Sequence, residues 1–287
     1  MKLSKSFIGL VTVSTIFVLY ASGLYTNFQS DSALEIVDFS IDKAASEKNI
    51  PSNPDRVPLY GDLHVHTKYS FDAYIFGVTA TPYDAYKYAI GEAIKHPLGF
   101  DMKLREPLDF YAVTDHGFYM GMIENYADTS SKMSKKEWTK PMHNLNRPEN
   151  VTVESLGGRA DLFSSVLTEA IIKPYPYWHP KVWKAWLTNN IQVALQSFDY
   201  DVHKSAWADV ANAAEEFNDP GKFTTFIGYE FTTSTDVEGG NLHRNVIFNS
   251  SNAPIRPWTR IDSLNPEDLW TWMDGLRDKG LDSLAMP

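Results

Sequence analysis

The chain has 287 residues, and its 36 acidic side chains against 26 Lys and Arg give a formal net charge of −10 with histidine neutral. This acidic balance argues against nonspecific nucleic-acid binding, which needs a basic face to displace counterions from phosphates. The sequence contains no cysteine, which excludes disulfides, zinc fingers, iron–sulfur clusters and cysteine nucleophiles. Any metal site must therefore be built from His, Asp and Glu.

The first 25 residues have the composition of an export segment. Lys2 and Lys5 precede an uncharged stretch over residues 7–25, and small residues follow its most apolar part at 21–23. This pattern is typical of a cleaved signal peptide, and the uncharged stretch is also long enough for an uncleaved membrane anchor. Both interpretations predict an exported protein, either periplasmic or anchored in a membrane and facing the periplasm.

A polar segment with several prolines covers residues 26–58, where Pro51, Pro54 and Pro58 interrupt any regular element. We interpret this segment as a linker or as an arm that wraps around the folded unit. The folded unit is expected to begin near Leu59 and to continue to Pro287.

Strands and helices alternate in the predicted folded unit. Strand character, with many β-branched or aromatic residues, occurs in residues 59–67, 109–117, 224–232 and 243–249. Helical patterns cover residues 82–96 and 265–279, each with a helix-start sequence. The alternation predicts an α/β fold with parallel strands. Residues 118–221, with amphipathic runs at 161–172 and 179–198, are expected to form a helical insertion between the second and third strands.

Side chains that bind metals are concentrated near the ends of these strands. His64 and His66 alternate along the first strand, so both imidazoles are expected on the same face. The other candidates are Asp72, Asp115, His116, Glu230 and His243. A buried carboxylate at the end of an apolar strand, such as Glu230, is costly unless a cation or donor compensates it. The convergence of such residues from four strands predicts a metal site. The remaining histidines have no paired spacing, so no functional role is assigned to His96, His143, His179 and His203.

These motifs resemble those of the polymerase and histidinol phosphatase (PHP) superfamily of metal-dependent hydrolases. The stretch GDLHVHTKYSFDA resembles its first motif, and AVTDHG resembles its second. GYEFT followed by GGNLHRNVIFN is similar to the third region of a narrower bacterial group, the domain-of-unknown-function family 3604. Over residues 59–287, the resemblance implies a distorted (β/α)7 barrel that holds two or three metal ions at the carboxyl ends of its strands.

The resemblance also implies roles for individual residues. It implies metal ligands at His64, His66, Asp72, His116, Glu230 and His243, with Glu230 bridging two ions. Asp115 is expected to be a catalytic group, either as a ligand or as the acid that orients one. PHP proteins have further histidine ligands after the third region, and no histidine follows His243. We therefore expect residues 59–287 to be the N-terminal portion of a barrel, with an incomplete site and little activity alone.

Nitrogen and oxygen ligands suit Zn, Mn or Fe. Such ions activate water and neutralise charge on a phosphoryl or carbonyl oxygen, so hydrolysis is the expected reaction. The resemblance favours a phosphoester, and Arg244 is a candidate to hold an anionic oxygen of a small-molecule substrate, with an ordinary structural arginine as the alternative. An amidohydrolase-type enzyme and a non-catalytic exported metal-binding protein are the two alternative functions.

Overall fold

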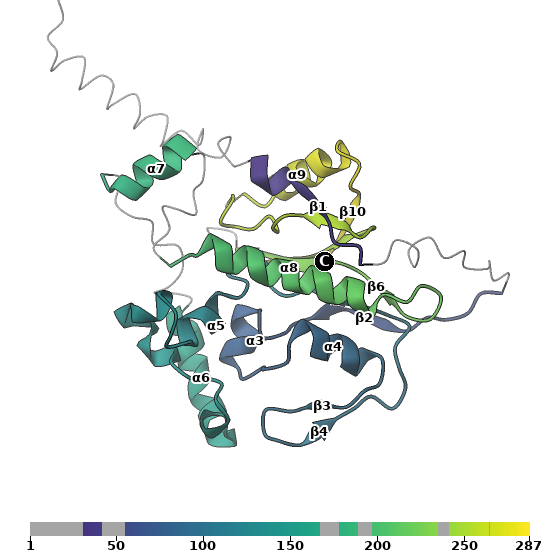
Figure 1. Cartoon of the computed structure of the whole chain (residues 1–287), viewed down its shortest axis with the longest axis horizontal. Helices are drawn as coiled ribbons and strands as arrows, with labels where there is room; N and C mark the ends of the chain where they lie inside the picture. The colour runs from purple at the N-terminus through teal and green to yellow at the C-terminus, as the bar shows by residue number, and fades with distance from the viewer. Residues whose placement is uncertain (1–30, 42–54, 167–177, 189–196, 235–240, 264) are drawn as a thin grey trace, which may run out of the picture.

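The computed structural model describes residues 31–41, 55–166, 178–188, 197–234, 241–263 and 265–287 (Figure 1). The predicted export segment lies outside these residues. Among the described helices, none combines the length and apolar character needed to cross a bilayer.

Three predicted strand segments lie side by side in parallel. β2 (Gly61–Val65) pairs with β5 (Phe110–Val113), and β5 pairs with β6 (Thr224–Thr225). A short break separates β6 from β7 (Gly228–Ser234). Thr224 of β6 pairs with Phe110, and Glu230 of β7 forms a bridge with His116. Between these two pairs both segments advance by the same number of residues. β6 and the start of β7 therefore lie along β5 in one register.

The strand over residues 243–249 runs in the opposite direction to the prediction. β8 (Asn241–Phe248) is antiparallel to β7, and β10 (Ser283–Met286) is antiparallel to β8. Only residues 235–240 connect β7 to β8, whereas a parallel crossover needs about a dozen residues or more. The described strands form open sheets, so the barrel implied by the resemblance stays a prediction.

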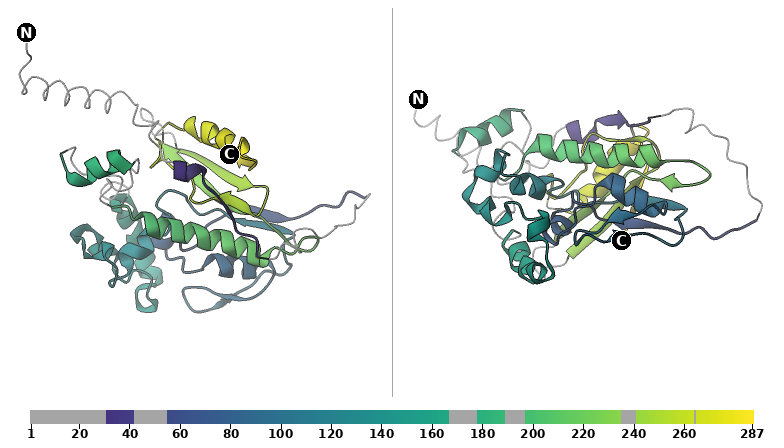
Figure 2. Two further views of the ribbon diagram at one scale, coloured as in Figure 1. Left: turned by 45° about the horizontal axis from the view of Figure 1, so that its top comes forward. Right: turned by 60° about the horizontal axis from the view of Figure 1, so that its bottom comes forward.

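Two helices cover one face of the parallel strands (Figure 2). α4 (Pro82–Ala89) begins with a capping box between Thr81 and Asp84, and it packs against α8 (Tyr200–Phe217) and β5. The helix predicted over 82–96 is wrong beyond Ala89, because Gly91 adopts a left-handed φ of 85°. The chain then forms the hairpin of β3 (Ile94–Lys95) and β4 (Asp101–Met102).

Aromatic side chains fill the core beneath these helices. Trp207 of α8 and Trp272 of α9 (Asp268–Arg277) both contact the Tyr229 ring, with centroid distances of 5.9 and 6.3 Å. The predicted helix at 265–279 is therefore present, with ends that differ by two or three residues. Because side chains alternate along a strand, burying Tyr229 in this core directs Glu230 to the opposite face of β7.

Part of the polar N-terminal segment packs on the folded unit. η2 (Asp31–Leu34) leads into β1 (Ile36–Asp38), which pairs with β9 (Asn252–Pro254). The indole nitrogen of Trp272 donates to the carbonyl of Ala33 at 2.7 Å. Residues 42–54 lie outside the described residues, so the predicted linker or arm stays a prediction over that part of the segment.

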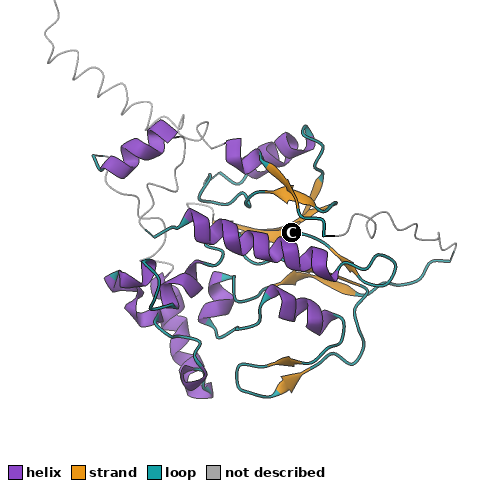
Figure 3. Ribbon diagram, in the orientation of Figure 1, coloured by secondary structure: helices purple, strands orange, loops and turns teal. Residues whose placement is uncertain are grey.

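The region between β5 and β6 is helical, as predicted, and most of it gathers at one end of the molecule (Figure 3). Its elements are α5 (Met122–Ala127), η3 (Met133–Lys135), η4 (Glu137–Met142), η5 (Pro148–Asn150), α6 (Val153–Ser165) and α7 (Pro180–Thr188), followed by α8. Half of the run predicted at 161–172 and part of that at 179–198 lie outside the described residues. α8 ends this region but packs on the sheet, as an ordinary crossover helix does.

Candidate metal centre

The six predicted ligands meet at the carboxyl ends of the parallel strands. His64 lies on β2 and His66 directly follows it, His116 follows β5, and Glu230 lies on β7. Because β8 is antiparallel, its amino-terminal half carries His243 to the same edge, where it pairs with Thr232. Asp72 lies in the first turn of α3 (Phe71–Ile75).

The potential ligand atoms fall into three overlapping groups, and within each group the atoms lie within 4.8 Å of one another. The groups are His64–His66–Glu230, His66–Asp72–His116 and His116–Glu230–His243. The His64 and His66 rings have centroids 5.1 Å apart, as expected for alternate residues on one face of a strand. The three groups therefore form one continuous cluster.

Glu230 lies at the centre of the cluster. Its side chain is almost completely buried, and Oε2 lies 3.4 Å from His64 Nε2, 2.9 Å from His66 Nε2 and 3.1 Å from His116 Nδ1. Within the described structure, Oε2 accepts no hydrogen bond of normal geometry. A buried carboxylate oxygen is rarely left in this state, because the loss of its hydration is costly.

The cluster attracts positive charge. Burial lowers the pKa of His66, but its contacts with Asp72 and Glu230 outweigh burial and raise this pKa to about 10. Burial raises the pKa of Asp72, yet hydrogen bonds with His116 and His66 bring it far below its usual value. The pKa of Glu230 is lowered for the same reason, against the effect of burial.

The arrangement fits a divalent cation. Two atoms that each lie about 2.1 Å from one ion are roughly 3.0–3.4 Å apart for octahedral to tetrahedral angles. The three nitrogen–oxygen distances around Glu230 Oε2 span 2.9–3.4 Å. A bound cation would also compensate the orphaned carboxylate oxygen while leaving the imidazoles neutral. The donor set can therefore hold a metal ion, and its nitrogen and oxygen atoms are compatible with Zn, Mn or Fe.

Asp115 lies behind the cluster and belongs to none of the three ligand groups. It is completely buried, and its two oxygens accept hydrogen bonds from the Thr67 amide at 2.5 Å and the Thr67 hydroxyl at 2.6 Å. Burial raises the pKa of Asp115. Of the two roles expected for this residue, the geometry favours the acid that orients a ligand.

Comparison with family models gives a match over most of the chain. Residues 53–287 match the model of the family described as "Protein of unknown function (DUF3604)". The chain belongs to this family. Searches of the curated proteins and of the solved structures found no match to it.

Arg244 does not join the cluster in this DUF3604 chain. It pairs in register with Phe231, whose completely buried side chain lies on the Tyr229 face of the sheet. Alternation places the Arg244 side chain on that face, opposite to His243. Its guanidinium donates to the carbonyl of His243 at 2.6 Å.

Sequence reasoning missed the hydroxyl groups that contact the ligands. Thr232 Oγ1 lies 2.5 Å from His116 Nδ1, and Ser70 Oγ lies 2.7 Å from His66 Nδ1. Thr232 was detectable, because it follows Glu230 by two residues and so shares its face of the strand. Ser70 follows His66 by four residues, and only the turn before α3 brings it back.

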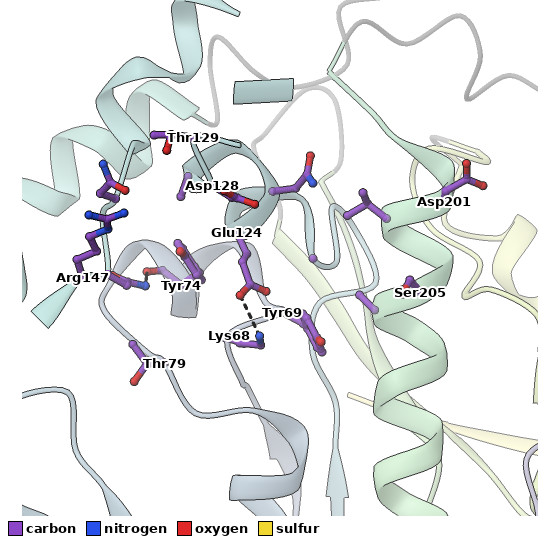
Figure 4. A pocket seen from close by; sticks show the side chains of 17 residues that line it. Lys68, Tyr69, Tyr74, Thr79, Glu124, Asp128, Thr129, Arg147, Asp201 and Ser205 are labelled. Atoms are coloured by element: carbon purple, nitrogen blue, oxygen red, sulfur yellow. Dashed lines mark hydrogen bonds and ion pairs between the residues drawn. The ribbon is translucent and has the colours of Figure 1, made fainter. Parts of the chain in front are cut away.

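A cavity of about 810 Å³ in the DUF3604 chain lies between α3, α5 and the amino end of α8 (Figure 4). Lys68 and Tyr69 line it, and Lys68 Nζ pairs with Glu124 Oε1 at 2.9 Å. None of the six ligand candidates lines this cavity. It therefore lies beside the loop that joins His66 to Ser70 and is separate from the cluster.

Proposed function

We propose that the chain carries a centre of two or three divalent metal ions and is a metal-dependent hydrolase that acts on phosphoesters. The observation that carries this proposal is the buried Oε2 of Glu230, which faces three imidazole nitrogens without accepting a hydrogen bond. The three overlapping ligand groups support more than one ion, with His66, His116 and Glu230 each contributing to two of them.

A bound divalent ion would lower the pKa of water to near 7 and neutralise charge that develops on a phosphoryl oxygen. The protein itself supplies the ligands and an access route. The side chains of His64 and His243 are 57% and 32% exposed, whereas that of Glu230 is 3% exposed. A substrate would approach from the solvent-exposed side of His64 and His243, while Glu230 contacts the imidazoles from the buried side of the cluster.

Membership of the PHP superfamily is part of this proposal. Its support is the placement of the ligands at the carboxyl ends of three parallel strands, where barrel enzymes place their active sites. A small anionic substrate is proposed from the expected reaction. Arg244 is not proposed as its anchor, because its side chain lies on the opposite face of β8 from His243.

The test compares metal content and turnover in the full chain. Purified protein loaded with Zn, Mn or Fe is expected to hold metal by mass spectrometry of the metals, and to hydrolyse p-nitrophenyl phosphate or its diester with low turnover. The His64→Ala/His66→Ala double variant should lose both properties. His96→Ala is the matched control, because His96 stacks on Phe100 away from the cluster.

The alternative functions give different results in the same assays. Metal binding without turnover on any phosphoester, carboxylic ester or amide would support a non-catalytic metal-binding protein. Turnover confined to amides would support an amidohydrolase-type enzyme. Unchanged metal content in the double variant would show that the metal is bound elsewhere.

We also propose that the protein is exported, on the basis of Lys2, Lys5 and the uncharged residues 7–25. Fractionation of bacterial cells that express the full chain should place it in the periplasm or on the periplasmic face of the inner membrane. Recovery from the cytosol with Met1 intact would contradict export.

A further inference from the structure

We propose that Ser70, supported by Asp115, fixes the proton of His66 on Nδ1 and so presents Nε2 to the metal ion. Ser70 and Asp115 are thus positioning residues that act through His66. This inference rests on the proposed metal centre, which it deepens.

Ser70 makes three contacts through one hydroxyl group. The completely buried Oγ accepts a hydrogen bond from the backbone amide of His116 at 2.8 Å and lies 2.7 Å from His66 Nδ1. Asp115 is its third partner, because interaction with the Ser70 hydroxyl lowers the pKa of this acid against the effect of burial. It thereby connects two candidate ligands to one buried acid.

The number of protons available assigns the direction of each bond. A hydroxyl group has one proton to donate and two lone pairs that accept. The backbone amide of His116 can only donate, so it uses one lone pair. The carboxylate of Asp115, which accepts from Thr67 at both oxygens, has no proton to donate, so the Ser70 proton is directed to Asp115. The second lone pair then accepts from His66 Nδ1–H, and a neutral His66 is left with an unprotonated Nε2.

The free nitrogen is the one that faces the centre of the cluster. His66 Nε2 lies 2.9 Å from Glu230 Oε2. The Nδ1 atom also lies 3.5 Å from Asp72 Oδ1, which is longer than its 2.7 Å contact with Ser70. Asp72 Oδ2 instead lies 3.3 Å from His116 Nε2. The two carboxylates and Ser70 therefore each have a distinct position around the ring of His66.

The start of α3 provides independent support. Ser70 is the N-cap residue of α3, yet its side chain makes no capping hydrogen bond. A serine cap stabilises a helix by about 1 kcal/mol, so turning the hydroxyl toward His66 forgoes that stabilisation. The backbone fixes this position, because the Ser70 amide donates to the Thr67 carbonyl at 3.1 Å and the Tyr74 amide donates to the Ser70 carbonyl at 3.0 Å.

The experiment measures the imidazole ¹⁵N and ¹H resonances of ¹⁵N-histidine-labelled protein, with Zn²⁺ and without metal. In the Zn²⁺-loaded wild type, His66 is expected to show a slowly exchanging proton on Nδ1 and a metal-shifted Nε2. Ser70→Ala should move the Nδ1 proton into fast exchange and weaken Zn²⁺ binding by about 10- to 100-fold. Asp115→Asn, which changes the acceptor behind Ser70, should act in the same direction.

Thr152→Ala is the matched control, because Thr152 caps α6 through its side chain and has no contact with the cluster. This variant should lose stability without changing Zn²⁺ affinity or the His66 resonances. If Ser70→Ala fails to fold, Asp115→Asn and the wild-type spectra still decide the proposal.

The outcomes separate this inference from the proposed function. Absence of Zn²⁺ binding by the wild type would overturn the metal centre. The Nδ1 proton of metal-free His66 would still test the positioning role of Ser70, because Ser70 should protect this proton from exchange with water. Three results would overturn the positioning role of Ser70 and Asp115. They are a Zn²⁺-loaded His66 with its proton on Nε2, an unchanged Zn²⁺ affinity in Ser70→Ala, and an unprotected Nδ1 proton in the metal-free wild type.

Discussion

Glu230 and Asp115 are joined through their main chains, because the Glu230 amide donates to the Asp115 carbonyl at 3.0 Å. Their side chains nevertheless lie in different surroundings. Burial raises the pKa of both acids, but in Glu230 the contacts with His66 and His116 outweigh burial and lower the pKa, whereas the pKa of Asp115 stays raised. One carboxylate therefore faces the cluster and the other supports it from behind.

Glu230→Gln should reduce metal binding, because it removes a negative charge from the centre of the cluster while preserving the shape of the side chain. We expect fewer bound ions and an affinity lowered by roughly tenfold or more, as measured by metal analysis and titration calorimetry. Glu137→Gln is the control, since the Glu137 side chain is 85% exposed and pairs only with Lys140 among the described contacts. Equal metal content in both variants would contradict the central role of Glu230.

Gly61→Ala should destabilise the protein by about 1–3 kcal/mol. A Cβ atom at Gly61 would lie 2.2 Å from the carbonyl oxygen of Phe110, so β2 would have to move away from β5. Gly158→Ala in α6 is the matched control, because its Cβ would meet no atom within 4 Å. That change should stabilise the protein by about 0.5–1 kcal/mol, because alanine favours a helix more than glycine does. Urea unfolding measures both changes, and similar effects in the two variants would be inconsistent with the close approach of β2 and β5.

His203 should make the protein less stable as the pH falls from 6.5 to 4. Burial lowers the pKa of His203 to about 4, although its Nε2 lies 2.8 Å from the carbonyl of Gly117. Between these pH values the unfolded chain binds a proton at this site and the folded protein does not, so the stability present above pH 6.5 is lost towards pH 4. His203→Gln should remove about 3 kcal/mol of this dependence. The check is the difference between wild-type and variant unfolding free energies at both pH values, and a constant difference would rule out a neutral buried His203.

Asp262→Asn should destabilise the protein by about 3–5 kcal/mol, because it removes the negative charge that faces the buried guanidinium of Arg256. The two side chains form a bidentate pair, with Nη2–Oδ1 at 2.6 Å and Nη1–Oδ2 at 2.7 Å. Adding Arg256→Met to this variant should recover part of the lost stability, because the double variant no longer buries a charged guanidinium at this site. Denaturant unfolding of the single and double variants checks this, and a double variant that is less stable than Asp262→Asn would contradict it.

The sequence by itself indicated four residues of the cluster, because their placement depends on local rules. Alternation along a strand places His64 and His66 on one face, and the carboxyl ends of neighbouring parallel strands bring His116 and Glu230 to one edge. The same alternation rule separates His243 from Arg244, so the location of Arg244 was available from the sequence too.

Only the tertiary structure decided how the cluster is supported. The direction of β8 depends on its pairing with β7, and the end of α4 depends on the left-handed turn at Gly91 and the hairpin that follows. Asp115 and Ser70 lie in the same motifs as the ligands, but their hydrogen bonds join the turn after β2 to the end of β5. Such contacts depend on how separate segments pack, and no local periodicity encodes the side-chain direction of a residue in a turn.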